Sequence, residues 1–201
     1  QPSTTRVRKK LTGVLFSGVG LTSTGFIAAI TVAGLAAQDI TGSSRLAGIP
    51  AAASTIGTAL GSAILASATA RSGRRPVLIG AYVVAGAAAV VGAIAVGSAS
   101  FTLLVAAMFA LGFGNSASHL TRYAAADLHQ PNRRTAAIGW IVWASTIGSV
   151  AGPNLLRVSA DTADGAGLAP FSGPYLVAAV AFGAAASAAV DGVTDDDTVP
   201  E

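Results

Sequence analysis

Three polar side chains that can bind a solute or relay a proton interrupt one of the apolar runs of this chain. Asn115, His119 and Arg122 follow one another at positions i, i+4 and i+7. In a helix this spacing places all three on one face. An amide, an imidazole and a guanidinium on a shared face predict a substrate or proton pathway. The alternative for His119 alone is a polar residue that a neighbouring helix satisfies.

The runs around these residues are long enough to cross a bilayer. A hydrocarbon core of about 30 Å takes roughly 20 helical residues. Charged residues make up only 10% of the 201 residues, against about 25% in a typical soluble domain. The expected spans are Leu11–Ala36, Ala47–Ala68, Val77–Gly97, Phe101–Ala126, Ala136–Leu156 and Phe171–Val190.

The fold class that follows is an all-α membrane protein, a bundle of six transmembrane helices. The bundle is expected to occupy residues 11–190. A basic arm at residues 1–10 and an acidic tail at residues 191–201 are expected to be disordered. The many small residues, 24 glycines among them, favour close packing of helices in lipid.

Arg122 would be costly inside such a bundle. Placing an arginine at the centre of a membrane helix costs about 2.5–3.5 kcal/mol on insertion scales. We therefore expect Arg122 to face the bundle interior or a watery cavity, or to reach toward the inner surface. The alternative is an internal pair with Asp127, five residues later, which is an awkward separation for two residues of one helix.

Basic residues predict the orientation, because cytoplasmic loops of membrane proteins are rich in Lys and Arg. The opposite side has only Arg45 and Arg157. Both termini are therefore expected in the cytoplasm, and the protein in the plasma membrane. The basic residues of the cytoplasmic side are Arg6, Arg8, Lys9, Lys10, Arg71, Arg74, Arg75, Arg133 and Arg134.

The turn after the second span resembles the signature loop of the major facilitator superfamily. The match consists of Arg71, Gly73, Arg74, Arg75 and Leu78, between the second and third spans. In that family the loop takes part in a conformational latch, and its aspartate is replaced here by alanine. The resemblance implies that the acidic residue ending the fourth span, Asp127, pairs with Arg74. The alternative is a plain basic cytoplasmic turn.

The fifth span partly matches a motif that the same family associates with antiporters. Gly148, Gly152 and Pro153 match, whereas the glycine pair that should follow is absent. Small residues four apart allow helices to approach closely, and proline bends a helix. The alternative is a generic close contact, like the one predicted for Gly57 and Gly61 in the second span.

Together these matches resemble the N-terminal half of a major facilitator transporter. The resemblance implies secondary active transport of a small solute, with the fifth-span motif favouring proton-coupled efflux. Such transporters have twelve helices, so the chain is expected to be a fragment, to pair with a second six-helix half, or to self-associate. The alternative function is a degenerate half-transporter that acts as a membrane assembly or regulatory subunit.

Other classes of function find no support in the sequence. There are no cysteines, and two histidines do not make a typical zinc site. No nucleophile triad or nucleotide-binding loop predicts an enzyme or a cofactor. The net charge of +3 is explained by the basic loops, so nucleic acid is not an expected partner. The expected partners are the lipid bilayer and a small-molecule solute.

Overall fold

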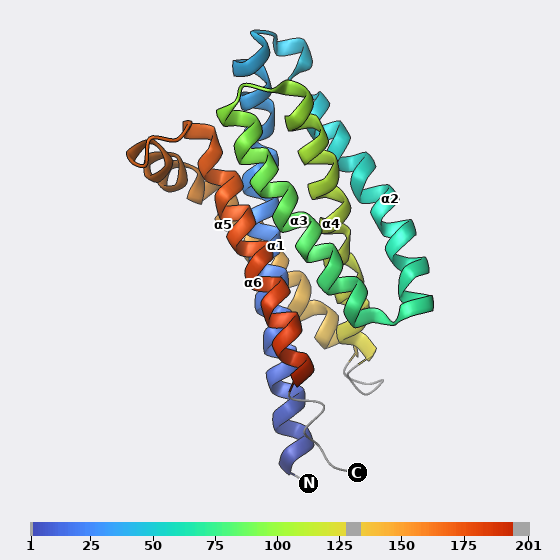
Figure 1. Cartoon of the computed structure of the whole chain (residues 1–201). Coiled ribbons are helices and arrows are strands. Elements are labelled where there is room, and N and C mark those ends of the chain that lie inside the picture. Colours follow the sequence, from blue (N-terminus) through green and yellow to red (C-terminus); the bar gives the residue numbers. More distant parts are fainter. Residues whose placement is uncertain (1, 128–133, 195–201) are drawn as a thin grey trace.

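The computed structural model describes residues 2–127 and 134–194 of the chain. Side chains are described at 19–119 and, except at 141, 153, 157 and 170, at 139–190. Within these ranges every regular element is helical, and the long helices run side by side as one bundle (Figure 1). The elements are α1 (Pro2–Thr41), η1 (Ser44–Leu46), α2 (Ile49–Ser72), α3 (Arg74–Gly97), α4 (Phe101–Asp127), α5 (Arg134–Gly165), η3 (Pro170–Ser172) and α6 (Gly173–Thr194).

Several helices extend beyond the expected boundaries. α1 begins at Pro2, so residues 2–10, expected to be a disordered arm, belong to the first helix. α5 continues past Leu156 to Gly165, and α6 includes residues 191–194 of the expected tail. Hydropathy marks where a helix leaves lipid, whereas charged residues are compatible with further helical turns. Residues 195–201 of the expected tail lie outside the described residues.

The exposed surface of the bundle is apolar. Val180 of α6 is 73% exposed, and Ile64 and Val83 are more than half exposed. A surface of this kind requires lipid rather than water around it. Five described segments are long and apolar enough to cross a membrane: Val19–Thr41, Ser44–Ser72, Arg74–Gly97, Phe101–His119 and Gly173–Val190. A span in α5, where several side chains are undescribed, stays a prediction, and so does the total of six.

The helices pack as two interleaved triplets, one formed by α2, α3 and α4 and the other by α5, α6 and α1. α2 and α3 make their most extensive contacts with α4, whereas α5 and α6 make theirs with α1. α3 also packs against α6, whereas α2 touches α3, and α5 touches α6, far less, although each of these pairs is consecutive in the chain. The pattern is unchanged when α1 is exchanged with α4, α2 with α5 and α3 with α6. The bundle therefore has an approximate two-fold relation between α1–α3 and α4–α6.

A core of large buried side chains packs α3, α4 and α6 against one another. Tyr175 and Phe182 of α6 are fully buried, as is Met108 of α4. The Tyr175 hydroxyl lies 3.6 Å from Met108 Sδ, and the rings of Tyr82 and Phe182 are 6.3 Å apart. This core leaves the sides of α1, α2, α4 and α5 that face away from it to form the candidate site.

Candidate functional site

A polar cavity of about 510 Å³ lies where α1, α2, α4 and α5 converge. It contains two of the three residues that sequence spacing placed on one face, Asn115 and His119 of α4. α1 contributes Ser23 and the apolar side chains of Phe26, Ile27 and Ile30. The other lining residues are Ser54, Thr55, Thr58, Ala59, Ser62, Ser118, Ser145 and Ser149.

Glycines hold the four helices close enough to form this cavity. A methyl group at Gly57 would overlap the carbonyl oxygen of Phe109, and one at Gly61 would lie 2.6 Å from that of Phe113. α2 is therefore in backbone contact with α4 along this line. A side chain at either glycine would force the two helices apart.

The glycines of the predicted fifth-helix motif hold α5 close to α1 on the other side of the cavity. A methyl group at Gly148 would overlap the carbonyl oxygen of Gly20, and one at Gly152 would lie 3.0 Å from Ile27 Cγ2. Gly148 and Gly152 thus place α5 against α1. The backbone of Pro153 continues α5, and its side chain is outside the described residues.

These two glycine contacts show which residues of α1 and α4 occupy equivalent positions in the two triplets. A methyl group at Gly57 would lie 3.1 Å from the backbone nitrogen of Phe113, and one at Gly148 would lie 3.1 Å from that of Thr24. Thr24 of α1 therefore corresponds to Phe113 of α4. Counting onward along each helix, Phe26 corresponds to Asn115, and Ile30 corresponds to His119.

Most hydroxyl groups of the cavity wall already donate hydrogen bonds within the protein. Thr58 Oγ1 lies 2.9 Å from the Ser54 carbonyl oxygen and 3.0 Å from that of Gly112, and the second contact joins α2 to α4. Ser118 and Thr22 pair at 3.1 Å between α4 and α1. Intrahelical bonds to a carbonyl oxygen are also donated by Ser54, Thr55, Ser62, Ser145 and Ser149.

Asn115 differs from these hydroxyl groups. Its side chain is only 8% exposed, and its carboxamide has no hydrogen-bond partner in the described part of the chain. A carboxamide has two N–H donors and one oxygen acceptor. A buried polar group left without a partner costs about 1–3 kcal/mol, so this group requires water or a ligand in the cavity. The neighbouring His119 is exposed at the same wall.

Arg122 cannot be joined to this wall from the structure. Its backbone belongs to α4, one helical turn beyond His119, and its side chain is outside the described residues. A role for Arg122 in the pathway therefore stays a prediction. The same holds for Asp127, the last residue of α4, and for its expected pair with Arg74.

The signature-loop residues form a tight turn that is separate from the cavity. Arg71 lies in the last turn of α2, Gly73 joins the helices with φ +82°, and Arg74 begins α3. The Gly73 N–H donates to the Thr69 carbonyl oxygen at 3.1 Å. Arg71 and Arg75 are exposed, and Arg74 is half-buried. None of these residues is among the described residues that line the cavity.

Sequence reasoning missed the hydroxyl residues of the cavity wall. Their signal is a stripe of Ser54, Thr58 and Ser62 at four-residue spacing on a mostly apolar stretch of α2, repeated by Ser145 and Ser149 in α5. It also treated Gly57 and Gly61 as a generic contact, although they are the α2 counterparts of the fifth-helix glycines.

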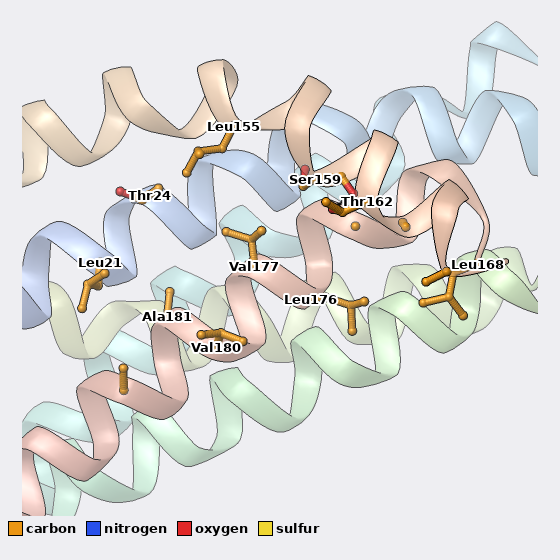
Figure 2. Close-up of a pocket in the computed structure, with 14 residues that line it drawn as sticks. Leu21, Thr24, Leu155, Ser159, Thr162, Leu168, Leu176, Val177, Val180 and Ala181 are labelled. Atoms are coloured by element: carbon orange, nitrogen blue, oxygen red, sulfur yellow. Dashed lines mark hydrogen bonds between the residues drawn. The ribbon is translucent and has the colours of Figure 1, made fainter.

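A second cavity, of about 450 Å³, lies between α1, α5 and α6 and is apolar (Figure 2). Leu21, Leu155 and Val180 line it. Its hydroxyl groups are engaged within their own helices, because Thr24 donates to Gly20, Ser159 to Leu156 and Thr162 to Val158. This cavity therefore offers little to a polar solute, and the cavity beside Asn115 is the better candidate site.

Comparison with known proteins agrees with the membrane bundle. A family model described as Major Facilitator Superfamily matches residues 14–195. The uncharacterized MFS-type transporter YddS of Bacillus subtilis (strain 168) is 34% identical over 168 residues, which cover 84% of this chain and 37% of YddS. YdeG, another uncharacterized MFS-type transporter of that organism, is 33% identical over 168 residues, with coverage of 84% and 38%.

A third relative has a named substrate. The riboflavin transporter RfnT of Brucella anthropi is 28% identical over 151 residues, 75% of this chain and 37% of RfnT. No solved structure shows a significant match. The chain thus spans well under half the length of the relatives it matches. Since the family model covers most of the chain, this integral membrane protein belongs to the Major Facilitator Superfamily.

Proposed function

We propose that this chain is the N-terminal six-helix half of a secondary active transporter, and that the cavity beside Asn115 is one wall of its solute pathway. The buried carboxamide of Asn115, which no described residue pairs with, is the observation that carries the proposal. A second six-helix half, or a second copy of this chain, supplies the facing wall. Alternating access then arises from rocking of one unit against the other.

The location of the basic residues supports cytoplasmic termini. The start of α1, the turn between α2 and α3 and the end of α4 lie at one end of the bundle (Figure 1). Arg71, Arg74 and Arg75 belong to that turn. By the positive-inside rule this end faces the cytoplasm, and we place the protein in the plasma membrane.

Proton-coupled efflux is the expected mode of transport. Among the described residues of the cavity wall, His119 is the side chain of a kind that can relay a proton. Gly148, Gly152 and Pro153 match a motif associated with antiporters. RfnT, which is named as a transporter of riboflavin, supports a small organic molecule as the solute class.

The second candidate function is a non-transporting membrane subunit that assists assembly or regulation. One observation favours it: Ala70 stands where the signature loop of the family has aspartate. This candidate predicts a cavity that is accessible from one side of the membrane at all times.

A single introduced cysteine distinguishes the two functions, because the natural chain has none. Ser145→Cys places a thiol in the cavity wall, and Val83→Cys places one on the outer surface of α3. Each variant is labelled with a membrane-impermeant thiol reagent in right-side-out and inside-out vesicles, with and without a pH gradient. The transporter proposal predicts that the gradient moves Ser145→Cys labelling from one side to the other, while Val83→Cys stays unlabelled. Labelling from one side under every condition supports the non-transporting subunit.

A further inference from the structure

The cavity wall divides into regions of different chemistry, and this division points to a class of solute. This inference rests on the proposed function, because it treats the cavity as a solute site. Asn115 supplies hydrogen-bond donors and an acceptor that no described part of the protein uses. A carboxamide with both kinds of group free pairs best with a molecular edge that has an acceptor beside a donor.

The hydroxyl groups around Asn115 favour solutes that donate hydrogen bonds. The hydroxyl groups of Thr58, Ser62 and Ser149 donate hydrogen bonds to backbone carbonyl oxygens. Each hydroxyl oxygen keeps lone pairs that can accept a hydrogen bond. The wall formed by α2 and α5 therefore accepts hydrogen bonds from a solute more readily than it donates them.

α1 presents an apolar wall to the same cavity. Phe26 and Ile30 take the positions that Asn115 and His119 occupy in the other triplet. An aromatic ring next to an aliphatic side chain offers contact area to a flat apolar surface. A ligand that touches both kinds of wall must have a polar edge and an apolar face.

The charge of the wall limits the solute further. Among the lining residues that the structure describes, none is Asp, Glu, Lys or Arg. An organic ion placed against these described residues would lose hydration without gaining an opposite charge from an Asp, Glu, Lys or Arg among them. The volume of about 510 Å³ is in the range of about 300–1,000 Å³ that small-molecule sites occupy.

We propose that the cavity recognises an uncharged ring compound with an amide edge, in which a ring N–H lies next to a carbonyl group. The amide edge pairs with the Asn115 carboxamide through two hydrogen bonds, and remaining N–H groups donate to the hydroxyl oxygens of α2 and α5. The face of the ring lies against Phe26 and Ile30.

The test is equilibrium binding of radiolabelled uracil to the full chain in lipid nanodiscs, with competition by related compounds. Uracil has the amide edge, 1,3-dimethyluracil has the same ring without N–H groups, and orotate and benzylammonium supply an anion and a cation. We expect uracil to bind at least 10-fold more tightly than each of the other three. A loss of this size is what the removal of paired hydrogen bonds at a buried polar site produces.

Two leucine variants locate the preference in the cavity. Asn115→Leu is expected to reduce the preference for uracil over 1,3-dimethyluracil to less than threefold. Asn154→Leu is the matched control, because the Asn154 side chain is exposed on α5, donates to the Val150 carbonyl oxygen at 2.6 Å and does not line the cavity. It should keep the preference of the natural chain.

The proposal is overturned if uracil fails to bind, if the two uracils bind equally, if an ion binds most tightly, or if the preference survives in Asn115→Leu. Each comparison on the natural chain stands even if a variant is poorly folded. The accessibility of Ser145→Cys is measured without any solute. A transporter with another solute class would therefore pass the thiol test and fail the binding test.

Discussion

The two helix triplets of this bundle are held together by equivalent glycine contacts, which we call the frame. They differ in the side chains that line the cavity. Gly57 and Gly61 place α2 against α4, and Gly148 and Gly152 place α5 against α1 in the same way. A third pair follows the same rule: methyl groups at Gly114 and Gly25 would crowd alanines of α3 and α6, respectively. Where backbones touch, only glycine fits, so both triplets carry it.

The positions that face the cavity show the opposite behaviour. Asn115 and His119 of α4 are polar, whereas Phe26 and Ile30 of α1 are apolar. The glycine contacts between the helices require neither choice. The difference teaches that helix contacts fix the shape of the site in both triplets, and that the residues free of those contacts give the site its chemistry.

The connections differ as well. α2 and α3 are joined through Gly73 alone, with three arginines around the turn, whereas α5 and α6 are joined by a longer link that contains η3. Only the first of these turns carries the signature residues Arg71, Arg74 and Arg75. The end of the bundle with this turn is therefore specialised in sequence as well as in charge.

The largest effect is expected from alanine at the frame glycines. Gly57→Ala and Gly148→Ala each bring a methyl group into a backbone carbonyl oxygen, so each should destabilise the bundle by about 3 kcal/mol or more. Gly183→Ala is the control, because a methyl group there meets nothing within 4 Å. Thermal unfolding in detergent measures all three. A large loss for one frame glycine only would break the equivalence of the triplets.

The next effect concerns the corresponding cavity residues Phe26 and Asn115. Phe26→Ala removes a half-buried ring that packs on the core and should cost about 1–3 kcal/mol. Asn115→Leu removes a buried carboxamide that has no partner in the described part of the chain, and should raise stability by about 1 kcal/mol in the absence of solute. Opposite shifts of the unfolding temperature support a structural role for Phe26 and a role in solute binding for Asn115. A loss of stability in Asn115→Leu would show that the carboxamide serves the fold.

A smaller effect is expected at the signature turn. Gly73 has φ +82° and ψ +165°, a backbone conformation that is occupied almost only by glycine and costs another residue about 1–3 kcal/mol. Gly73→Ala should lower stability by about that amount, whereas Gly80→Ala, inside α3 with open space around it, should be neutral or slightly stabilising. Equal unfolding temperatures of the two variants would contradict a structural requirement for glycine in the turn.

The smallest effect is expected from Thr58→Val. The variant removes the hydrogen bond from Thr58 to the Gly112 carbonyl oxygen, and such bonds between membrane helices average about 0.6 kcal/mol. Thr55→Val is the comparison, because Thr55 bonds only within its own helix at Ala51. A loss above about 2 kcal/mol would mean that polar contacts, rather than glycines, hold α2 against α4.

The sequence predicted the helices well because apolar runs and glycines mark where helices can form and turn. The spacing of Asn115 and His119 also predicted their shared face. The extension of α5 to Gly165 escaped prediction, because hydropathy says nothing about helical turns outside lipid. The hydroxyl wall escaped for a different reason: a serine such as Ser149 is compatible with a helix contact, a lipid-facing bond to its own backbone or a cavity. Only the arrangement of the helices distinguishes these environments.

The most direct test of the cavity as a solute pathway compares two faces of α5. Ser149 lines the cavity, whereas Ile147, two residues earlier, is 57% exposed on the outer surface. The rate at which a charged thiol reagent labels Ser149→Cys and Ile147→Cys in membrane vesicles is the measurement. Our account predicts that Ser149→Cys reacts at least 10-fold faster, because water fills the cavity and lipid covers the outer face. Equal rates, or faster labelling of Ile147→Cys, would contradict it.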